Sequence, residues 1–201
     1  MKKLLILTAF LLLGFGMQAQ DNALLNRIKE VNSAKSSFDA DLNNVFVKKG
    51  KQTAQEGKLY FIKPHCFTAQ FTTGKYMIVN EKQIKMNIGL FHGTFKIKDG
   101  GMMQSLANIF LYGFQGRIQD LADENDYSLT TKTENGYHIV TGTTNKKKLL
   151  GIGYKQVVFK YHTDSLLLKE IVLFDYNGSM DVYTVSNVQY DVEVDPNLFV
   201  F

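Results

Sequence analysis

The sequence predicts an α+β protein that is mainly β, with antiparallel strands and two helices. Three observations support this fold class: short alternating segments separated by brief turn-like gaps, two Asn-Gly pairs, and two stretches with apolar residues at helical spacing. Parallel strands need crossover connections of about a dozen or more residues. Because most of the gaps are far shorter, the strands are expected to form an antiparallel meander.

Two helices are expected, one at the start of the mature chain and one internal. Within residues 21–38, Leu24, Leu25, Ile28 and Val31 recur at helical spacing, which predicts an amphipathic helix. Residues 100–114, "GGMMQSLANIFLYGF", carry a broad apolar stripe. This stripe predicts the second helix.

Strands are expected before and after the internal helix. Phe38, Ala40, Leu42 and Phe46 alternate with polar residues, as in a strand with two different faces. The other expected strands are residues 58–63, 66–73, 75–80, 83–88, 92–98, 127–133, 137–143, 154–162, 166–176, 179–192 and 199–201, with residues 48–57 as a connecting loop. The pairs Asn135–Gly136 and Asn177–Gly178 predict hairpin turns, because both central residues of a type I′ turn need positive φ.

Several strands carry apolar residues on both faces. Leu59 and Phe61 lie on one side of residues 58–63, and Tyr60 and Ile62 lie on the other. In an antiparallel strand with one solvent-exposed face, apolar and polar residues would alternate. The second apolar face therefore packs on another sheet layer or lines a curved, partly closed barrel.

The first residues predict export. Lys2 and Lys3 precede the apolar run "LLILTAFLLLGFG", and Ala19 stands at a cleavage point. The run is shorter than the roughly 20 residues that a membrane-spanning helix needs. We therefore expect a signal peptide over residues 1–19, cleaved near Ala19, and a single soluble domain over residues 20–201 in a bacterial envelope compartment.

The remaining composition gives no sign of catalysis or nucleic-acid binding. Removing Lys2 and Lys3 lowers the formal net charge from +4 to +2, too little to favour a nucleic-acid partner. The histidines have no metal-ligand spacing, and Cys66 has no evident activating base. A nucleophile elbow and a phosphate-binding loop are both missing. We expect no catalytic residue, no metal, no cofactor and no enzyme activity.

Three segments resemble one known family. They are "AKSSFDADL", "GKLYFIKPHCFTAQF" and "YMIVNEKQI", and the sequence is similar there to LolA, the family of periplasmic carriers of outer-membrane lipoproteins. The ending "VDPNLFVF" resembles the last strand of that family. Lys63 stands where the family commonly has Arg, and residues 81–83 depart from the family's turn.

The resemblance implies a strongly curved antiparallel sheet that forms an unclosed half-barrel, covered by the N-terminal helix and an internal lid helix. Acyl chains of lipoproteins would lie between sheet and helices, and Lys63 would gate the lid by binding its carbonyl groups. The implied cavity residues are Leu59, Phe61, Phe67, Ala69, Phe71, Ile78, Met102, Met103, Leu106 and Phe110. Phe38 and Leu42 fit either the core or the cavity.

The implied function is a monomeric carrier that ferries lipoproteins from the inner to the outer membrane. Its partners would be acylated lipoproteins, an inner-membrane lipoprotein-release transporter and an outer-membrane acceptor. Two alternatives remain open: a LolA-like lipid-binding, glycolipid-binding or envelope-sensing protein, and a structural module whose core is simply filled.

Overall fold

The computed structural model describes residues 21–88, 91–98, 101–144 and 153–201, so the expected signal peptide lies outside the described residues. A helix over residues 21–33, called the N-terminal helix below, comes first. The elements that follow are β1 (Ser37–Lys48), β2 (Lys51–Ile62), β3 (Cys66–Phe71), β4 (Tyr76–Val79), β5 (Gln83–Ile88), β6 (Phe91–Lys96), α2 (Met102–Gln115), α3 (Ile118–Asn125), β7 (Ser128–Glu134), β8 (Tyr137–Thr143), β9 (Tyr154–His162), β10 (Leu168–Asp175), β11 (Met180–Tyr190) and the 3-10 turn η2 (Pro196–Phe199).

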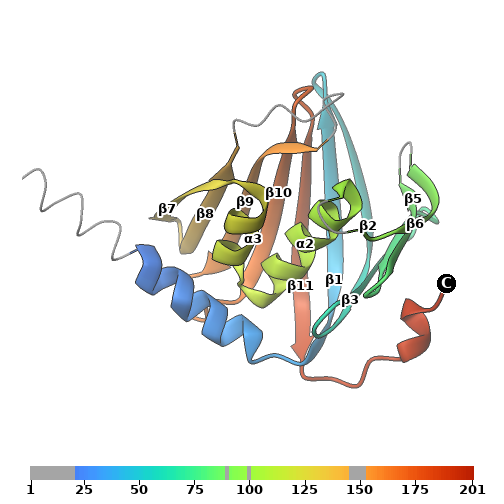
Figure 1. Ribbon diagram of the computed structural model, residues 1–201, viewed down its shortest axis with the longest axis horizontal. Coiled ribbons are helices and arrows are strands. Elements are labelled where there is room, and N and C mark those ends of the chain that lie inside the picture. Colours follow the sequence, from blue (N-terminus) through green and yellow to red (C-terminus); the bar gives the residue numbers. More distant parts are fainter. Residues whose placement is uncertain (1–20, 89–90, 99–100, 145–152) are drawn as a thin grey trace, which may run out of the picture.

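The strands form one antiparallel sheet, in the order β6-β5-β4-β3-β2-β1-β11-β10-β9-β8-β7. The sheet curls strongly around the helices (Figure 1). Within the described residues its two end strands, β6 and β7, do not pair with each other, so the sheet remains an open half-barrel. The expected fold class, a mainly β protein with an unclosed antiparallel half-barrel and covering helices, is confirmed.

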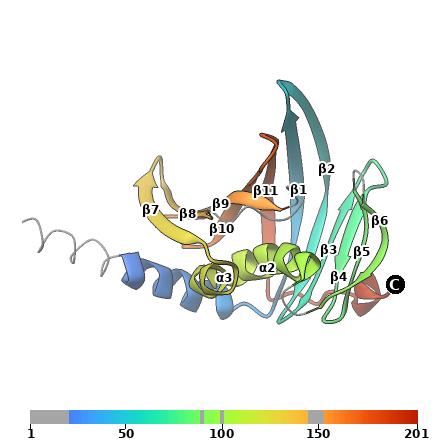
Figure 2. The same cartoon turned by 45° about the horizontal axis from the view of Figure 1, so that its top comes forward.

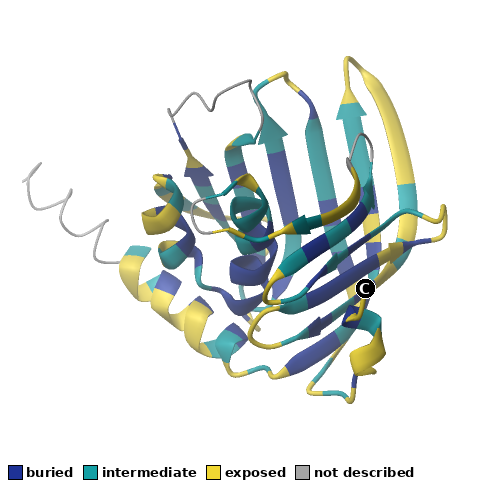
Figure 3. Ribbon diagram, turned by 45° about the vertical axis from the view of Figure 1, so that its right-hand side comes forward, coloured by how far each residue is buried: buried dark blue, intermediate teal, exposed yellow. Residues whose placement is uncertain are grey.

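The helices lie on the concave side of the sheet, and η2 lies on the convex side. α2 crosses the hollow of the half-barrel, with α3 and the N-terminal helix beside its C-terminal end (Figure 2). On the convex side, the Thr68 hydroxyl of β3 donates to the Leu198 carbonyl of η2 over 2.7 Å. The sheet and the helices therefore share one main core, and buried residues occur along both (Figure 3).

The prediction of a connecting loop over residues 48–57 is wrong. β1 continues to Lys48 and β2 begins at Lys51, joined by a turn in which Lys49 and Gly50 have φ of 50° and 75°. The first half of β2 pairs with β1, whereas the register with β3 begins only at Gly57. This half of the hairpin projects into solvent, which explains its polar composition (Figure 3).

Both expected hairpins form, but only one has the expected turn. Asn135 and Gly136 have φ of 51° and 80°, which fits a type I′ turn between β7 and β8. Between β10 and β11, Gly178 has a positive φ of 80° and Asn177 does not, so that turn is of another type.

Two further expectations about secondary structure are corrected. The last strand, expected at residues 199–201, is replaced by η2, where the Asp195 carboxylate accepts from the backbone N–H of Asn197 and caps the turn. A second internal helix, α3, occupies residues that carried no expected element. Among the described residues, no helix has both the length and the apolar content needed to span a bilayer.

Candidate functional site: an apolar pocket under a helix

The candidate site lies between α2 and the concave face of the sheet. α2 begins after Gly101 and ends at Gly116, whose positive φ of 67° closes the helix with a left-handed residue. Gly113 allows the helix to approach β9, because an added Cβ would lie 2.7 Å from the Phe159 ring. The Tyr161 hydroxyl donates to the Gly113 carbonyl over 2.9 Å. We call α2 the lid helix, because it covers the pocket described below.

Aromatic rings join the lid helix to the sheet. The Phe114 ring contacts the Phe38, Phe61 and Phe67 rings, with centroid separations of 5.3, 5.7 and 5.6 Å. The Phe110 ring contacts Phe67 and, edge to face at 5.1 Å, Tyr183. Each such ring pair contributes about 0.5–1.5 kcal/mol beyond its buried area. The lid helix is thus held by contacts that an entering apolar molecule would have to replace.

An apolar pocket remains next to these rings. Its empty volume is about 400 Å³, which includes the open solvent at its mouth. The lining residues come from the lid helix and from both halves of the sheet: Leu42, Leu59, Phe67, Ala69, Phe71, Met77, Ile88, Phe110, Phe114, Leu168, Glu170, Ile171, Tyr183 and Val185. Glu170 is the one charged residue among them, and its carboxylate is paired with Lys160 at 2.6 Å. The surface that the pocket presents is therefore almost entirely apolar.

Five of the residues expected in the cavity line this pocket: Leu59, Phe67, Ala69, Phe71 and Phe110. Alternation along β2 and β3 explains the placement, because residues two apart share one face of a sheet. Phe61 is buried on the same face and stacks on Phe38, with ring centroids 5.2 Å apart. It therefore belongs to the aromatic cluster beside the pocket rather than to the pocket wall.

Ile78 does not lie with this group. Met77 lines the pocket, and the neighbouring residue Ile78 points to the opposite face of β4. There it is paired in register with Thr68, whose hydroxyl binds η2 on the convex side. The expected position of Ile78 is thus one residue out of phase.

Three other expected residues lie at the N-terminal end of the lid helix, outside the pocket wall. Met103 and Leu106 are partly buried against the edge of the core, and Met102 is 38% exposed. The C-terminal half of the lid helix supplies the wall instead, through Phe110 and Phe114. Helical periodicity shows which residues share a stripe, but it does not show which turn of the helix lies over the pocket.

The wall opposite β2 and β3 was not expected. It consists of Leu168 and Ile171 from β10 together with Tyr183 and Val185 from β11. Apolar and polar residues alternate along β10 and β11, so both could be recognised as strands. The motifs that carry the family resemblance, however, do not include these residues. Only the pairing of β1 with β11 brings them to this site.

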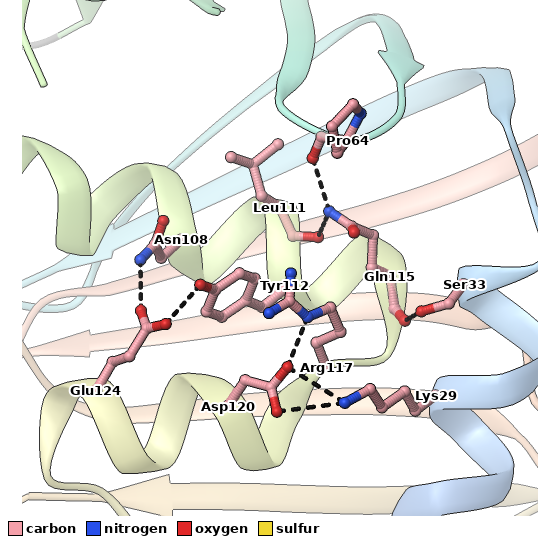
Figure 4. Close-up of polar contacts among 10 residues, drawn as sticks. All are labelled: Lys29, Ser33, Pro64, Asn108, Leu111, Tyr112, Gln115, Arg117, Asp120 and Glu124. Atoms are coloured by element: carbon pink, nitrogen blue, oxygen red, sulfur yellow. Dashed lines mark hydrogen bonds and ion pairs between the residues drawn. The ribbon is translucent and has the colours of Figure 1, made fainter. Parts of the chain in front are cut away.

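Hydrogen bonds fix the C-terminal end of the lid helix (Figure 4). The Ser33 hydroxyl, at the end of the N-terminal helix, donates to the Gln115 carbonyl over 2.8 Å. The buried side-chain amide of Gln115 donates to the carbonyls of Pro64 and Leu111 over 2.9 and 3.0 Å. This end of the lid helix is therefore tied to the N-terminal helix and to the turn after β2.

The prediction that the Lys63 side chain binds carbonyl groups of the lid helix is corrected, because its partner is a different helix. The Lys63 ammonium donates to the Ser33 carbonyl over 2.5 Å, and its side chain is exposed. Lys63 follows the end of β2, where its backbone N–H donates to the Ser36 carbonyl over 2.9 Å. This places the side chain beside the connection between the N-terminal helix and β1, so that its partner is that helix.

Polar contacts between the helices fix the outer side of the lid helix (Figure 4). Tyr112 and Asn108 donate to the two oxygens of the Glu124 carboxylate of α3 over 2.7 and 2.8 Å. Burial, followed by the hydrogen bond with Glu124, raises the pKa of Tyr112 to about 12. Tyr112 therefore stays a neutral hydrogen-bond donor at physiological pH.

A second polar contact joins α3 to the N-terminal helix. Asp120 accepts from Arg117 at 2.6 Å and from Lys29 at 3.3 Å. Burial alone would raise the pKa of Asp120, but the bonds to and charges of Arg117 and Lys29 lower it. The lid helix is thus braced on its outer side and at its C-terminal end.

Comparisons with known proteins concern the fold. No protein-family model matches the sequence, and no curated protein matches it. Among solved structures, an uncharacterised conserved protein from Thermus thermophilus is similar with a TM-score of 0.51 and 10% identity, over 90% of this chain and 94% of that one. At this identity the similarity establishes a shared fold and nothing more.

Two further solved structures were found to be similar to this chain. A LolA superfamily protein from Nitrosomonas europaea has a TM-score of 0.45 and 8% identity, over 90% of this chain and 97% of that one. A protein domain from Vibrio parahaemolyticus, described as a putative outer membrane lipoprotein-sorting protein, has a TM-score of 0.45 and 7% identity, over 88% and 94% of the two chains.

Proposed function

We propose that this protein is an exported carrier that shields the acyl chains of lipoproteins in the pocket and moves them from the inner to the outer membrane. One observation carries the proposal: an apolar pocket lies between a strongly curved sheet and a helix that packs on it through aromatic side chains. The signal-like first residues of the sequence support export.

The packing of the lid helix suggests how cargo can be held and released. Burying ten methylene groups contributes about 8 kcal/mol, which would make release slow. To admit a chain, however, the lid helix must give up contacts such as those of Phe114 and Phe110 with the sheet. The cost of separating these rings offsets much of the gain, so that the net preference for cargo remains small enough for exchange.

A structural module with a filled core is the second candidate, and the closeness of the pocket walls favours it. Phe67, for example, contacts both Phe110 and Phe114, with centroids 5.4 and 5.6 Å apart. If these rings never separate, the pocket does not admit an acyl chain. The two candidates therefore differ in whether the lid helix yields to an apolar ligand.

The first experiment asks whether lipid is present and whether the pocket holds it. The full chain, exported and purified from a bacterial periplasm, is extracted with chloroform and methanol, and the extract is analysed by mass spectrometry. The delipidated protein is then titrated with N-phenyl-1-naphthylamine, an apolar fluorescent dye, and the dye is displaced with a synthetic palmitoylated lipopeptide. Recovered lipid together with dye displacement is the expected result.

A variant of the pocket wall makes the test specific. Ala69 lines the pocket and is 6% exposed, so Ala69→Leu fills space that the dye would occupy. We expect at least a tenfold loss of dye affinity, whereas Ala54→Leu, on the exposed part of β2, leaves the affinity unchanged. Should Ala69→Leu unfold the protein, the smaller Ala69→Val serves instead. Dye binding that neither Ala69 variant changes would place the ligand elsewhere and contradict the carrier.

A further inference from the structure

The concave face of the sheet continues beyond the pocket and becomes polar. β1, β2 and β11 extend past the lid helix (Figure 2), and their registers define successive rows of side chains on one face. From the pocket outward the rows are Gly57, Leu42 and Val185, then Gln55, Asn44 and Tyr183, then Thr53, Phe46 and Asp181. Leu42, Val185 and Tyr183 line the pocket. Asp181 lies two residues from Tyr183 on the same strand, about 7 Å further out.

Hydrogen bonds organise this polar end, which we call the Asp181 cluster and define as Asn44, Gln55 and Asp181. The Gln55 side-chain amide donates to the Asn44 side-chain oxygen over 2.9 Å. Asn44, which is 4% exposed, donates to the Val182 carbonyl over 3.2 Å, and its side-chain amide lowers the pKa of the neighbouring Asp181 carboxyl. The Asp181 side chain is half-buried, so solvent still reaches this end of the pocket.

The Asp181 carboxyl lacks a positive partner among the residues that the structure describes. Burial raises its pKa to about 6; the bond from Asn44 lowers the pKa, and the charge of Asp175 raises it. Asp175 itself accepts from the backbone N–H groups of Asn177 and Ser179. At neutral pH the Asp181 carboxyl is therefore largely ionised without an ion pair in the described part of the chain.

In the described part of the chain, the other titratable groups that interact with Asp181 are tyrosines. Burial raises the pKa of Tyr154 on β9 and of Tyr183 on β11, and the charge of Asp181 raises both further. Both hydroxyl groups stay neutral throughout the physiological range. β1 and β2 face Asp181 with Phe46, Asn44, Thr53 and Gln55, none of which titrates. Within the described residues, the charge at this end of the pocket is consequently negative.

We propose that the Asp181 cluster binds the positively charged amino group of an amphiphile whose acyl or alkyl chain lies in the pocket. This inference rests on the proposed function, because it assumes that the pocket holds a chain. A half-buried carboxylate without a counter-ion is costly, and an ammonium group would supply charge-assisted hydrogen bonds. A carboxylate or phosphate head without an amine would be repelled by Asp181 and Asp175.

The experiment compares three probes with the same chain length and different head groups. Dodecylamine, dodecanol and dodecanoate are used to displace N-phenyl-1-naphthylamine from the full chain at pH 7.5 and at pH 5.0. We expect dodecylamine to bind at least tenfold more tightly than dodecanol at pH 7.5, and dodecanoate to bind more weakly than dodecanol. At pH 5.0 the preference for the amine should fall below about threefold, because Asp181 is then mostly protonated.

Variants assign the preference to Asp181. In Asp181→Asn the amine and the alcohol should bind alike at both pH values, with the affinity for dodecanol unchanged. Asp181→Glu should retain the preference, and Asp164→Asn, at an exposed turn residue, should behave as the unaltered chain. An amine preference that survives in Asp181→Asn, or equal losses for amine and alcohol, would overturn the inference. If dodecanol displaces the dye and no amine preference exists, only the head-group site fails; if no probe displaces the dye, the carrier itself fails.

Discussion

The Ser33 hydroxyl donates a 2.8 Å hydrogen bond to the Gln115 carbonyl, joining the last residue of the N-terminal helix to the last residue of the lid helix. Helix ends leave carbonyl groups without partners inside the helix, and Ser33 satisfies one of them. The bond links two helices far apart in the sequence at the point where the lid helix would hinge. Its removal should affect stability and ligand entry in opposite directions.

Ser33→Ala should lower the free energy of unfolding by about 0.5–1.5 kcal/mol, the usual contribution of one hydrogen bond. Because the closed lid helix competes with the ligand, weakening it should raise the affinity for N-phenyl-1-naphthylamine by about two- to tenfold. Urea unfolding and dye titration measure the two effects. Ser128→Ala, at an exposed position of β7, is the control, and a Ser33 variant that lowers both stability and affinity would argue against a hinge here.

Gly116→Ala should destabilise the protein for two reasons. Gly116 has a φ of 67°, and an added Cβ would lie 2.6 Å from the backbone oxygen of Ile28. Gly74→Ala isolates the first reason, since Gly74 has a φ of 80° with no atom within 4 Å of the added Cβ. The free energy of unfolding should fall by about 1 kcal/mol in Gly74→Ala. It should fall clearly further in Gly116→Ala. Equal losses in urea unfolding would mean that the N-terminal helix moves aside at little cost.

Lys63→Met tests whether Lys63 gates the lid helix. Its ammonium binds the Ser33 carbonyl from an exposed position, so the variant should lose less than about 1 kcal/mol of unfolding free energy. Dye affinity should stay within about twofold, because no bond from Lys63 to the lid helix is lost. The control is Lys82→Met, on the exposed β4–β5 turn. If Lys63→Met changes the dye affinity tenfold and Lys82→Met does not change it, Lys63 gates the lid helix.

Asp181 should make the protein less stable as the pH rises from about 4 to about 6. Its pKa is near 6 in the folded protein and 3.8 as the ordinary value, so the folded state binds more protons in this range and loses stability as they leave. Asp181→Asn should remove this loss and be more stable than the unaltered chain at pH 7.5 by about 1–3 kcal/mol, with little difference at pH 3.5. Urea unfolding at both pH values measures this difference in the free energy of unfolding. A variant less stable at pH 7.5 would mean that the carboxylate is stabilised in the fold.

The strands of the core could be predicted from the sequence, and the projecting half of β2 could not. Leu59 and Phe61 alternate with less buried neighbours because one face of β2 meets the lid helix. Lys51 to Glu56 have no such face: among the strands they are in register only with β1, and all of them except Ala54 carry polar side chains. A pattern that arises from burial is missing where nothing is buried.

α3 could not be predicted from the sequence, for a related reason. It is 8 residues long, and its buried side chains are Ile118, Leu121 and Ala122. Three apolar positions in two turns do not separate a helix from a loop, whereas the longer stripe of the lid helix does. Contacts with the lid helix and the N-terminal helix hold α3 in place, and those contacts depend on the tertiary structure.

The pocket could be predicted on one side only. Phe67, Ala69 and Phe71 alternate on a strand within the family-like motif, so their common face could be inferred. Tyr183 and Val185 complete the wall because β1 pairs with β11, more than 130 residues away in the sequence. Alternation identifies the face of a strand, but it does not identify the distant strand beside it.

The projecting part of the β1–β2 hairpin has a consequence for the evolution of the chain. Lys48, Lys51 and Gln52 are exposed, and β3 begins to pair with β2 only at Gly57. Removing or adding residues in opposed pairs near the turn would keep every later side chain on its own face of the sheet. Related chains can therefore differ in length at this hairpin while their pockets and lid helices stay the same.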